Sequence, residues 1–273
     1  MTSSSEPRLP SRTILYDEPS TETFELAEVA DYVEERTGLK VERRKGFMAH
    51  FKPKDRTAVA GRLAASRVKR PDRVEDNPAM YGEVKVEERL LAEPNLRIPG
   101  VLYDGYKLHG ILQSAMPKRE KSLDIVHVAF TNRLLATFDA DDGRYHARVI
   151  VCGYPSIIST SGIVEAPAKP RGFYAARQKL ESRGIYATEV IKEFYRGDFV
   201  EYDDERMTEV MKGYAMQALF YHLVNEPFCE RKRCRLYNAH WQSEVLEAQL
   251  GGDRYCARHE RMLEKVRDGA LDR

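Results

Sequence analysis

Hydrophobic and polar positions at the start of the chain predict a β-α-β unit. Residues 13–16 form a short apolar strand. Apolar residues then recur at helical spacing between Phe24 and Thr37, and Gly38 marks the end of that helix. Residues 39–42 have the pattern of a second strand. A helical connection between two strands favours a parallel pair.

Strand patterns dominate the middle of the chain, and helical patterns dominate its last third. Residues 101–115, 123–130, 145–151 and 157–160 carry apolar runs or alternation typical of strands. The predicted helices are 53–69, 87–91, 173–182, 187–195, 205–225, 241–250 and 256–266. This order predicts a mixed α/β fold, in which a mixed sheet with helices is followed by a helical C-terminal part.

The chain divides into three expected segments. Residues 1–12 are rich in Ser, Pro and charge and predict a disordered tail without the apolar segment of a signal peptide. Residues 13–120 form an N-terminal α/β portion, and 121–273 a second portion. No run approaches the roughly 20 apolar residues of a membrane span. We therefore expect a cytoplasmic protein without a membrane partner.

Overall charge argues against a general nucleic-acid or membrane-surface binder. The 44 Lys and Arg residues nearly cancel the 43 Asp and Glu residues, for a net charge of +1. A basic loop at 230–235 is the local exception, and basic loops beside zinc sites can touch phosphates. The balance of charge nevertheless speaks against nucleic acid as a partner.

Three cysteines and one histidine near the C-terminus have the spacing of a metal site. Four residues separate Cys229 from Cys234, and two separate Cys256 from His259. Three thiolates and one imidazole fill a tetrahedral shell, which predicts a structural Zn²⁺ that performs no chemistry. An accidental cluster and a Cys229–Cys234 disulfide remain as alternatives, although a cytoplasmic setting opposes the disulfide. Cys152, within an apolar strand, is expected in the core.

Basic residues surround two of these thiols. Arg231, Lys232, Arg233 and Arg235 flank Cys234 in the sequence. Basic neighbours lower the pKa of a thiol and favour the metal-binding thiolate. We expect this loop to help the site bind its ion.

Residues 221–236 and 256–259 resemble archaemetzincins, which are metzincin-type zinc peptidases. In that family H-E-x-x-H-x-x-G-x-x-H is followed by Cys, four residues, Cys and the Met of the methionine turn, and a C-x-x-C comes later. Residues 155–167 and 234–241 are most similar to a related archaeal family described as metallopeptidases. The resemblance extends from about Leu123 to the end. It implies a metzincin-like fold, a metallopeptidase family and a peptide or protein partner.

The catalytic motif departs from the family pattern. Alignment on Cys229 places Ala218 and Leu219 where the family has its first metal-binding His and its catalytic Glu. His222 falls on the second His, and Phe228 on the third. A catalytic zinc needs two His one helical turn apart and a Glu beside the first. In this register the ordinary site is absent, whereas the structural zinc pattern remains, with His259 replacing the last cysteine.

A rebuilt metal site is one way in which catalysis could persist. His222 and Glu226 are four residues apart, and His240 and Glu244 repeat that spacing. Together they would supply a two-His, carboxylate ligand set, with Glu226 and Glu244 as the candidate catalytic groups. A capped or packed histidine is the alternative at each position.

Three functions follow from these patterns. The first is a metallopeptidase-like protein that lost catalysis or uses the rebuilt site. The second is a non-enzymatic module that binds peptide or protein and uses zinc for structure only. In metzincins an edge strand pairs with an extended peptide, and residues 157–160 are our candidate for that strand. The third is nucleic-acid binding through the basic loop.

Overall fold

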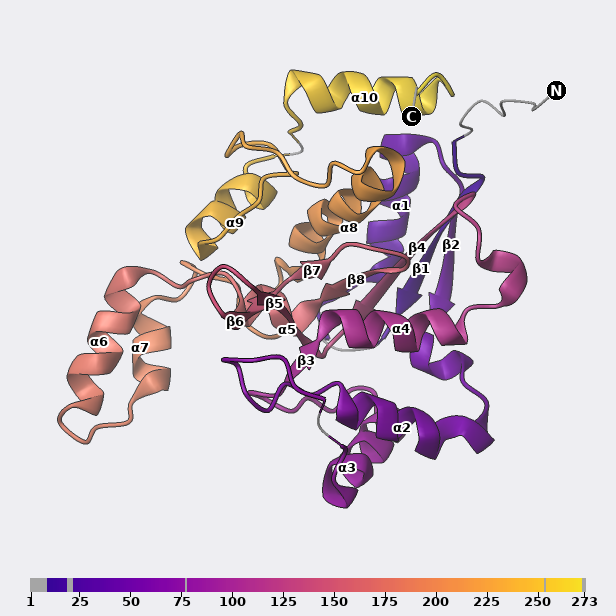
Figure 1. Cartoon of the computed structure of the whole chain (residues 1–273). Helices are drawn as coiled ribbons and strands as arrows, with labels where there is room; N and C mark the ends of the chain where they lie inside the picture. The colour runs from indigo at the N-terminus through magenta and orange to yellow at the C-terminus, as the bar shows by residue number, and fades with distance from the viewer. Residues whose placement is uncertain (1–8, 19–21, 77, 253, 272–273) are drawn as a thin grey trace.

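A five-stranded sheet forms the centre of the protein (Figure 1), seen in a computed structural model that describes residues 9–18, 22–76, 78–252 and 254–271. In spatial order its strands are β2 (Val41–Lys45), β1 (Arg12–Asp17), β4 (Ile125–Thr131), β8 (Ser156–Ser159) and β7 (Ile150–Val151). The first four are parallel, whereas β7 is antiparallel to β8 and forms one edge. The predicted parallel β-α-β opening is confirmed.

Helices cover both faces of this sheet. On β1, Leu15 packs into a core shared with α1 (Leu26–Thr37) and α8 (Met207–Val224). Its neighbours Ile14 and Tyr16 point to the other face, into a core shared with α2 (Arg56–Ala65) and α4 (Gly105–Ala115). This alternation along one strand gives three layers. Helix α8 is buried on nearly all sides, as its continuous apolar sequence indicates.

A second, smaller sheet lies beside the first. Its strand order is β3 (Leu102–Asp104), β5 (Leu134–Asp139), β6 (Arg144–Arg148). The segment predicted as one strand over 145–151 is therefore divided, because β6 pairs with β5 and β7 pairs with β8.

The strand prediction for 101–115 is wrong beyond β3. The Asp104 carboxylate accepts hydrogen bonds from the backbone N–H groups of Tyr106 and Lys107 and so caps the start of α4. Leu108, Ile111 and Leu112 then bury one helical face. The helical spacing of these three residues was the available signal.

Apart from α5, which was not predicted, the remaining α-helices agree in order with the predicted helical segments. They are α3 (Tyr81–Ala92), α5 (Thr160–Glu165), α6 (Arg171–Glu181), α7 (Thr188–Phe194), α9 (Gln242–Leu250) and α10 (Ala257–Arg267), with short 3₁₀ turns η1 (Phe47–His50), η2 (Pro53–Asp55) and η3 (Lys118–Glu120). Helices α6 and α7 project as a hairpin from the rest of the molecule (Figure 1) and enclose their own small core. Within the described residues, no helix combines the length and apolar character needed to cross a membrane.

The central sheet joins the two portions expected on either side of residue 120. Strands β1 and β2 come from before that position, and β4, β7 and β8 from after it. Arg12, expected at the end of a tail, already belongs to β1. Residues 1–8 of the expected tail lie outside the described residues.

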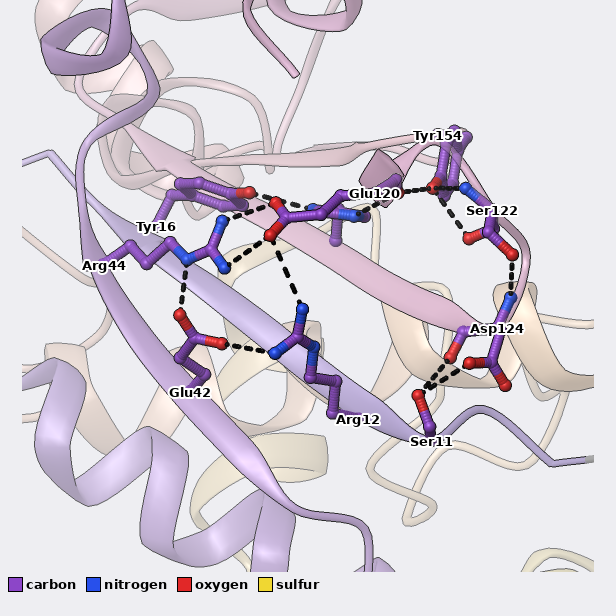
Figure 2. A network of polar contacts seen from close by, with 10 residues as sticks. Ser11, Arg12, Tyr16, Glu42, Arg44, Glu120, Ser122, Asp124 and Tyr154 are labelled. Atoms are coloured by element: carbon purple, nitrogen blue, oxygen red, sulfur yellow. Dashed lines mark hydrogen bonds and ion pairs between the residues drawn. The ribbon is translucent and has the colours of Figure 1, made fainter. Parts of the chain in front are cut away.

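A polar network connects β1, β2 and β4 on one face of the sheet (Figure 2). Glu120 accepts hydrogen bonds from Arg44, whose Nη1 and Nη2 lie 2.7 and 3.0 Å from its carboxylate oxygens. Its backbone oxygen lies 3.1 Å from Nε2 of His127, and Nδ1 of His127 lies 2.9 Å from the Tyr16 hydroxyl. Because a carbonyl only accepts, neutral His127 carries its proton on Nε2 and accepts from Tyr16.

His127 should make the protein less stable in mild acid. Burial lowers its pKa from 6.5 to about 4. Between about pH 7 and pH 5, His127 becomes protonated in the unfolded chain but stays neutral in the folded protein. The free energy of unfolding therefore falls as pH falls. We expect a loss of about 2 kcal/mol from this residue. Urea unfolding at both pH values, in the protein and in His127→Gln, measures it. Equal pH dependence in the two would contradict the assignment.

The close approach of Gln249 to Gly213 of α8 predicts that an alanine at position 213 destabilises the protein. A Cβ added at Gly213 in α8 would overlap the side-chain amide of Gln249, which its hydrogen bond to the Arg235 carbonyl holds in place. We expect Gly213→Ala to lower the free energy of unfolding by about 1–3 kcal/mol, although Ala favours helix. Gly61→Ala in α2, where a Cβ meets nothing within 4 Å, should instead stabilise by about 0.5–1 kcal/mol. Thermal unfolding of both variants tests the contrast, and a neutral Gly213→Ala would show that Gln249 moves aside.

Candidate metal centre and cleft

The four predicted metal ligands come together behind the C-terminal end of α8. Cys229 and Cys234 lie in the loop after α8, Cys256 is the N-cap of α10, and His259 lies in the first turn of α10. One ligand atom from each lies within 4.8 Å of all the others. Among the described residues this is the only group of three or more His, Cys, Asp or Glu side chains so arranged.

The distances in this group fit a tetrahedral ion. The Sγ atoms of Cys229 and Cys256 are 4.0 Å apart, and Nδ1 of His259 lies 3.5 Å from Sγ of Cys234 and 3.1 Å from Sγ of Cys256. Zinc bonds of roughly 2.3 Å to sulfur and 2.0 Å to nitrogen place tetrahedral ligands about 3.5–3.8 Å apart. All four cysteines of the chain are free thiols, so the disulfide alternative is not what the structure contains.

Backbone N–H groups point at two of the sulfur atoms. The N–H of Cys256 points to Sγ of Cys234 at 3.5 Å, and the N–H of Arg231 points to Sγ of Cys229 at 3.4 Å. Burial, with the neighbouring thiols, raises the pKa of Cys234 to about 12. A bound divalent cation would reverse this tendency, since a coordinating thiol is deprotonated outright.

Three side chains of the basic loop form ion pairs with carboxylates. Arg233 pairs with Glu247, and Lys232 with Glu244. Arg235 is fully buried and pairs with Glu209. Sequence neighbours alone could not reveal these three ion pairs, and the expectation that the loop assists the metal site stays a prediction.

A cleft of about 480 Å³ lies between the edge strand β7 and helix α8. One wall is formed by residues 147–152, which include the end of β6 and all of β7, and the floor carries Tyr214, Gln217 and Tyr221 of α8. Phe228 and His240, in the loops that follow α8, line the opposite side. The cleft thus joins aromatic rings, amide groups and one imidazole along an exposed strand edge.

The structure does not build the predicted pair of His222 and Glu226. Helix α8 ends at Val224, and Asn225 adopts the left-handed conformation with φ of 57°. Glu226 therefore lies beyond the helix and pairs with Arg258. The Nε2 atom of His222 is 2.8 Å from the carbonyl oxygen of Leu123. His222 is not among the residues that line the cleft.

His240 and Glu244 also lack the helical relation expected of them. His240 precedes α9, and Glu244 sits in its first turn. The Glu244 carboxylate accepts hydrogen bonds from the backbone N–H groups of His240 and Trp241, so it caps the helix. Of the four residues suggested for a second metal site, His240 alone lines the cleft.

Two further expectations change at the cleft. Cys152 is half-buried and lines the cleft, because the strand ends before it, whereas a core position was expected. Residues 157–160, suggested as the peptide-aligning edge, belong to β8 and the start of α5, and β8 pairs with β4 and β7 on its two sides. The free edge belongs to β7.

Gln217 is a cleft residue that the sequence interpretation missed. It is almost fully buried, and its Nε2 donates to the Tyr237 carbonyl oxygen at 3.2 Å. Its Oε1 has no hydrogen-bond partner among the described residues. A polar residue within the apolar run of α8 was the available signal, because buried amides are normally satisfied.

Comparisons with known proteins agree with the metallopeptidase resemblance. A family model described as "Probable metallopeptidase family (DUF6775)" matches residues 9–266, so the similarity also includes the N-terminal portion. No curated protein matches the chain. The crystal structure of archaemetzincin (AmzA) from Methanopyrus kandleri has a TM-score of 0.46 and 11% identity, covering 94% of this chain and 95% of that one.

Proposed function

Because the chain belongs to the probable metallopeptidase family DUF6775, we propose that the cleft beside β7 binds an extended peptide. The observation that carries this proposal is the free edge of β7. The Val149 oxygen accepts from the Ser159 N–H at 2.7 Å, so the polar groups of Val149 face β8. Those of Ile150, the next residue, face away from β8 and toward the open edge. An extended peptide can pair with them.

The four-ligand centre would hold a structural zinc. Its donors fill a tetrahedral shell and leave no position for substrate or water. The ion would tie α10 to the loop after α8 and so fix Phe228 and His240, which lie in the loops leading from α8 to α9. In this proposal the metal shapes the cleft and takes no part in a reaction.

Peptide binding without hydrolysis is the form of this function that the donor set supports best. The cleft contributes one imidazole, and the positions aligned with the family's first His and general base hold Ala218 and Leu219. A hydrolytic site rebuilt around His240 is the second candidate, because that imidazole faces the cleft. Nucleic-acid binding is less favoured, since three of the basic-loop side chains are already paired with carboxylates.

Substitution at Ile150 tests peptide binding. Ile150→Pro removes an N–H that faces the open edge and leaves the bonds between β7 and β8 in place. Ile150→Val keeps the N–H and is the matched control. With a pool of fluorescent hexapeptides of mixed sequence, we expect Ile150→Pro to weaken binding about tenfold and Ile150→Val to leave it nearly unchanged. Equal binding by the two variants would contradict the proposal.

The same peptides separate binding from hydrolysis. Mass spectrometry of the mixture after incubation with zinc-loaded protein should find the peptides intact. Cleavage that disappears in His240→Ala would instead establish the rebuilt site. Cleavage that survives His240→Ala would require catalytic groups other than this imidazole.

A further inference from the structure

A second cavity lies at the opposite end of the central sheet from the cleft. It has a volume of about 560 Å³ and lies where β1 and β2 end, beside the start of α1 and the end of α3. Strands β4 and β8 separate β1 and β2 from the edge strand β7. The carboxyl ends of parallel strands are a recurrent place for ligands in α/β proteins. Neither the family match nor the cleft accounts for this cavity.

Its walls are largely apolar. They include Phe24, Met48, Phe51, Val59, Leu90 and Leu91. Phe24, Val59 and Leu90 are at most 8% exposed, so they are fixed by the surrounding core. The volume falls within the roughly 300–1,000 Å³ of small-molecule sites, in which apolar side chains provide most of the contact.

Several charged groups at the cavity are already neutralised. Arg44 is held by Glu42 and Glu120. The Glu18 carboxylate lies 2.7 Å from Nη1 of Arg133. These groups border the cavity without offering a free charge to a ligand.

Three cations at the rim have no ion-pair partner among the described residues. Arg43, Lys45 and Arg56 line the cavity and are exposed, and Arg43 lies near the Asp17 carboxylate. The first turn of α1 also lines it, and its N-cap Glu25 makes no side-chain cap bond. Open N–H groups at a helix start add partial positive charge. Two acidic residues of the lining, Asp17 and Glu25, oppose this positive charge. The charge of Arg43 acts on the Asp17 carboxylate.

We propose that this cavity binds an amphipathic acid, that is, an apolar chain carrying one terminal anionic group. The chain would lie against Phe24, Met48 and Leu91, and the anion would meet Lys45 and Arg56 at the rim. Apolar burial supplies most of the affinity, and the two cations select the sign of the head group. The site is independent of the proposed peptide cleft.

Matched amphiphiles test both parts of this proposal. Dansyl-labelled undecanoic acid reports binding by its fluorescence, and laurate, dodecanol and dodecylamine then compete for it below their micelle concentrations. We expect laurate to displace the probe at the lowest concentration and dodecylamine at the highest. Lys45→Gln with Arg56→Gln should weaken laurate about tenfold and leave dodecanol nearly unchanged. Preference for dodecylamine, or equal competition by all three, would overturn the anionic assignment.

A blocking variant tests the location. Ala49 is exposed and lines the cavity, so Ala49→Trp places an indole there without altering a buried position. Ala175→Trp, on the exposed face of α6, is the matched control. We expect probe binding to be lost in the first and kept in the second. Binding kept in Ala49→Trp, or lost equally in both, would show that the probe sits elsewhere, for instance on the exposed apolar side chains of α7.

Discussion

We expect Cys234→Ala to lose the bound metal and to lower the free energy of unfolding by several kcal/mol. Structural zinc contributes directly to folding, with apparent binding energies of about 10–16 kcal/mol in zinc-finger peptides. Cys234 is 1% exposed and donates one of the four converging ligand atoms. Metal per chain by elemental analysis, and thermal unfolding with and without a strong chelator, measure both effects.

Cys152→Ala is the matched control for that experiment. Cys152 is the one cysteine outside the metal-ligand group. This variant should keep one zinc per chain and respond to chelator as the unchanged protein does. If Cys234→Ala retained zinc, or if the chelator left the melting temperature unchanged in all three proteins, the structural-zinc assignment would be wrong. Two metals per chain would point to a further site outside the cysteine group.

Glu87→Ala should cost about 3–5 kcal/mol, because it leaves the largely buried Arg67 guanidinium without a carboxylate and removes one of the two carboxylates beside Arg133. Glu87 lies on α3, is fully buried, and accepts from Arg67, from the Tyr103 hydroxyl at 2.7 Å and from Arg133 at 3.3 Å. Arg133 is itself 4% exposed and keeps Glu18 as its other carboxylate partner. Urea unfolding gives the change directly.

The next residue supplies the control. Glu88 is on the same helix but pairs with Lys85 and Thr57 near the surface. Glu88→Ala should therefore cost far less than Glu87→Ala. Similar losses in the two variants would mean that Glu87 acts through helix α3 itself rather than through Arg133. Glu87→Gln, which keeps the shape and removes the charge, should fall between them.

The convergence of the three cysteines and His259 was predictable because these residues occur in the sequence as two closely spaced pairs. Cys229 and Cys234, and Cys256 and His259, are close pairs in the sequence, so one local pattern marks each half of the site. Most helices and the central strands were predictable for the same reason, since periodicity is local. The exceptions are informative. Helix α4 begins because Asp104 caps it, and that cap outweighed the apolar runs that suggested strands.

Features that depend on distant partners were not accessible from sequence. The carboxylate of Glu87 meets Arg133 across 46 positions of the chain, and nothing in either neighbourhood marks the pair. Which strand forms the sheet edge depends on how β6 passes into β7, so β8 could not be recognised as an interior strand. His222 and His240 each have a carboxylate four residues later in the sequence. Because α8 ends at Val224 and α9 begins only at Gln242, neither carboxylate lies one helical turn from its histidine.

The arrangement of β1 has a consequence for how the chain acquires its fold. Its pairing with β4 brings Arg12 beside Ile125, so the middle of the central sheet closes only when segments more than a hundred residues apart have met. Closing so long a loop costs entropy before the contacts repay it, and parallel pairing across such distances is intrinsically slow. Until then the apolar faces of β1 and β4 are exposed to other chains. This protein is therefore most prone to aggregate while it folds at high protein concentration. Refolding by slow dilution, or with a chaperone, should raise the yield of folded molecules.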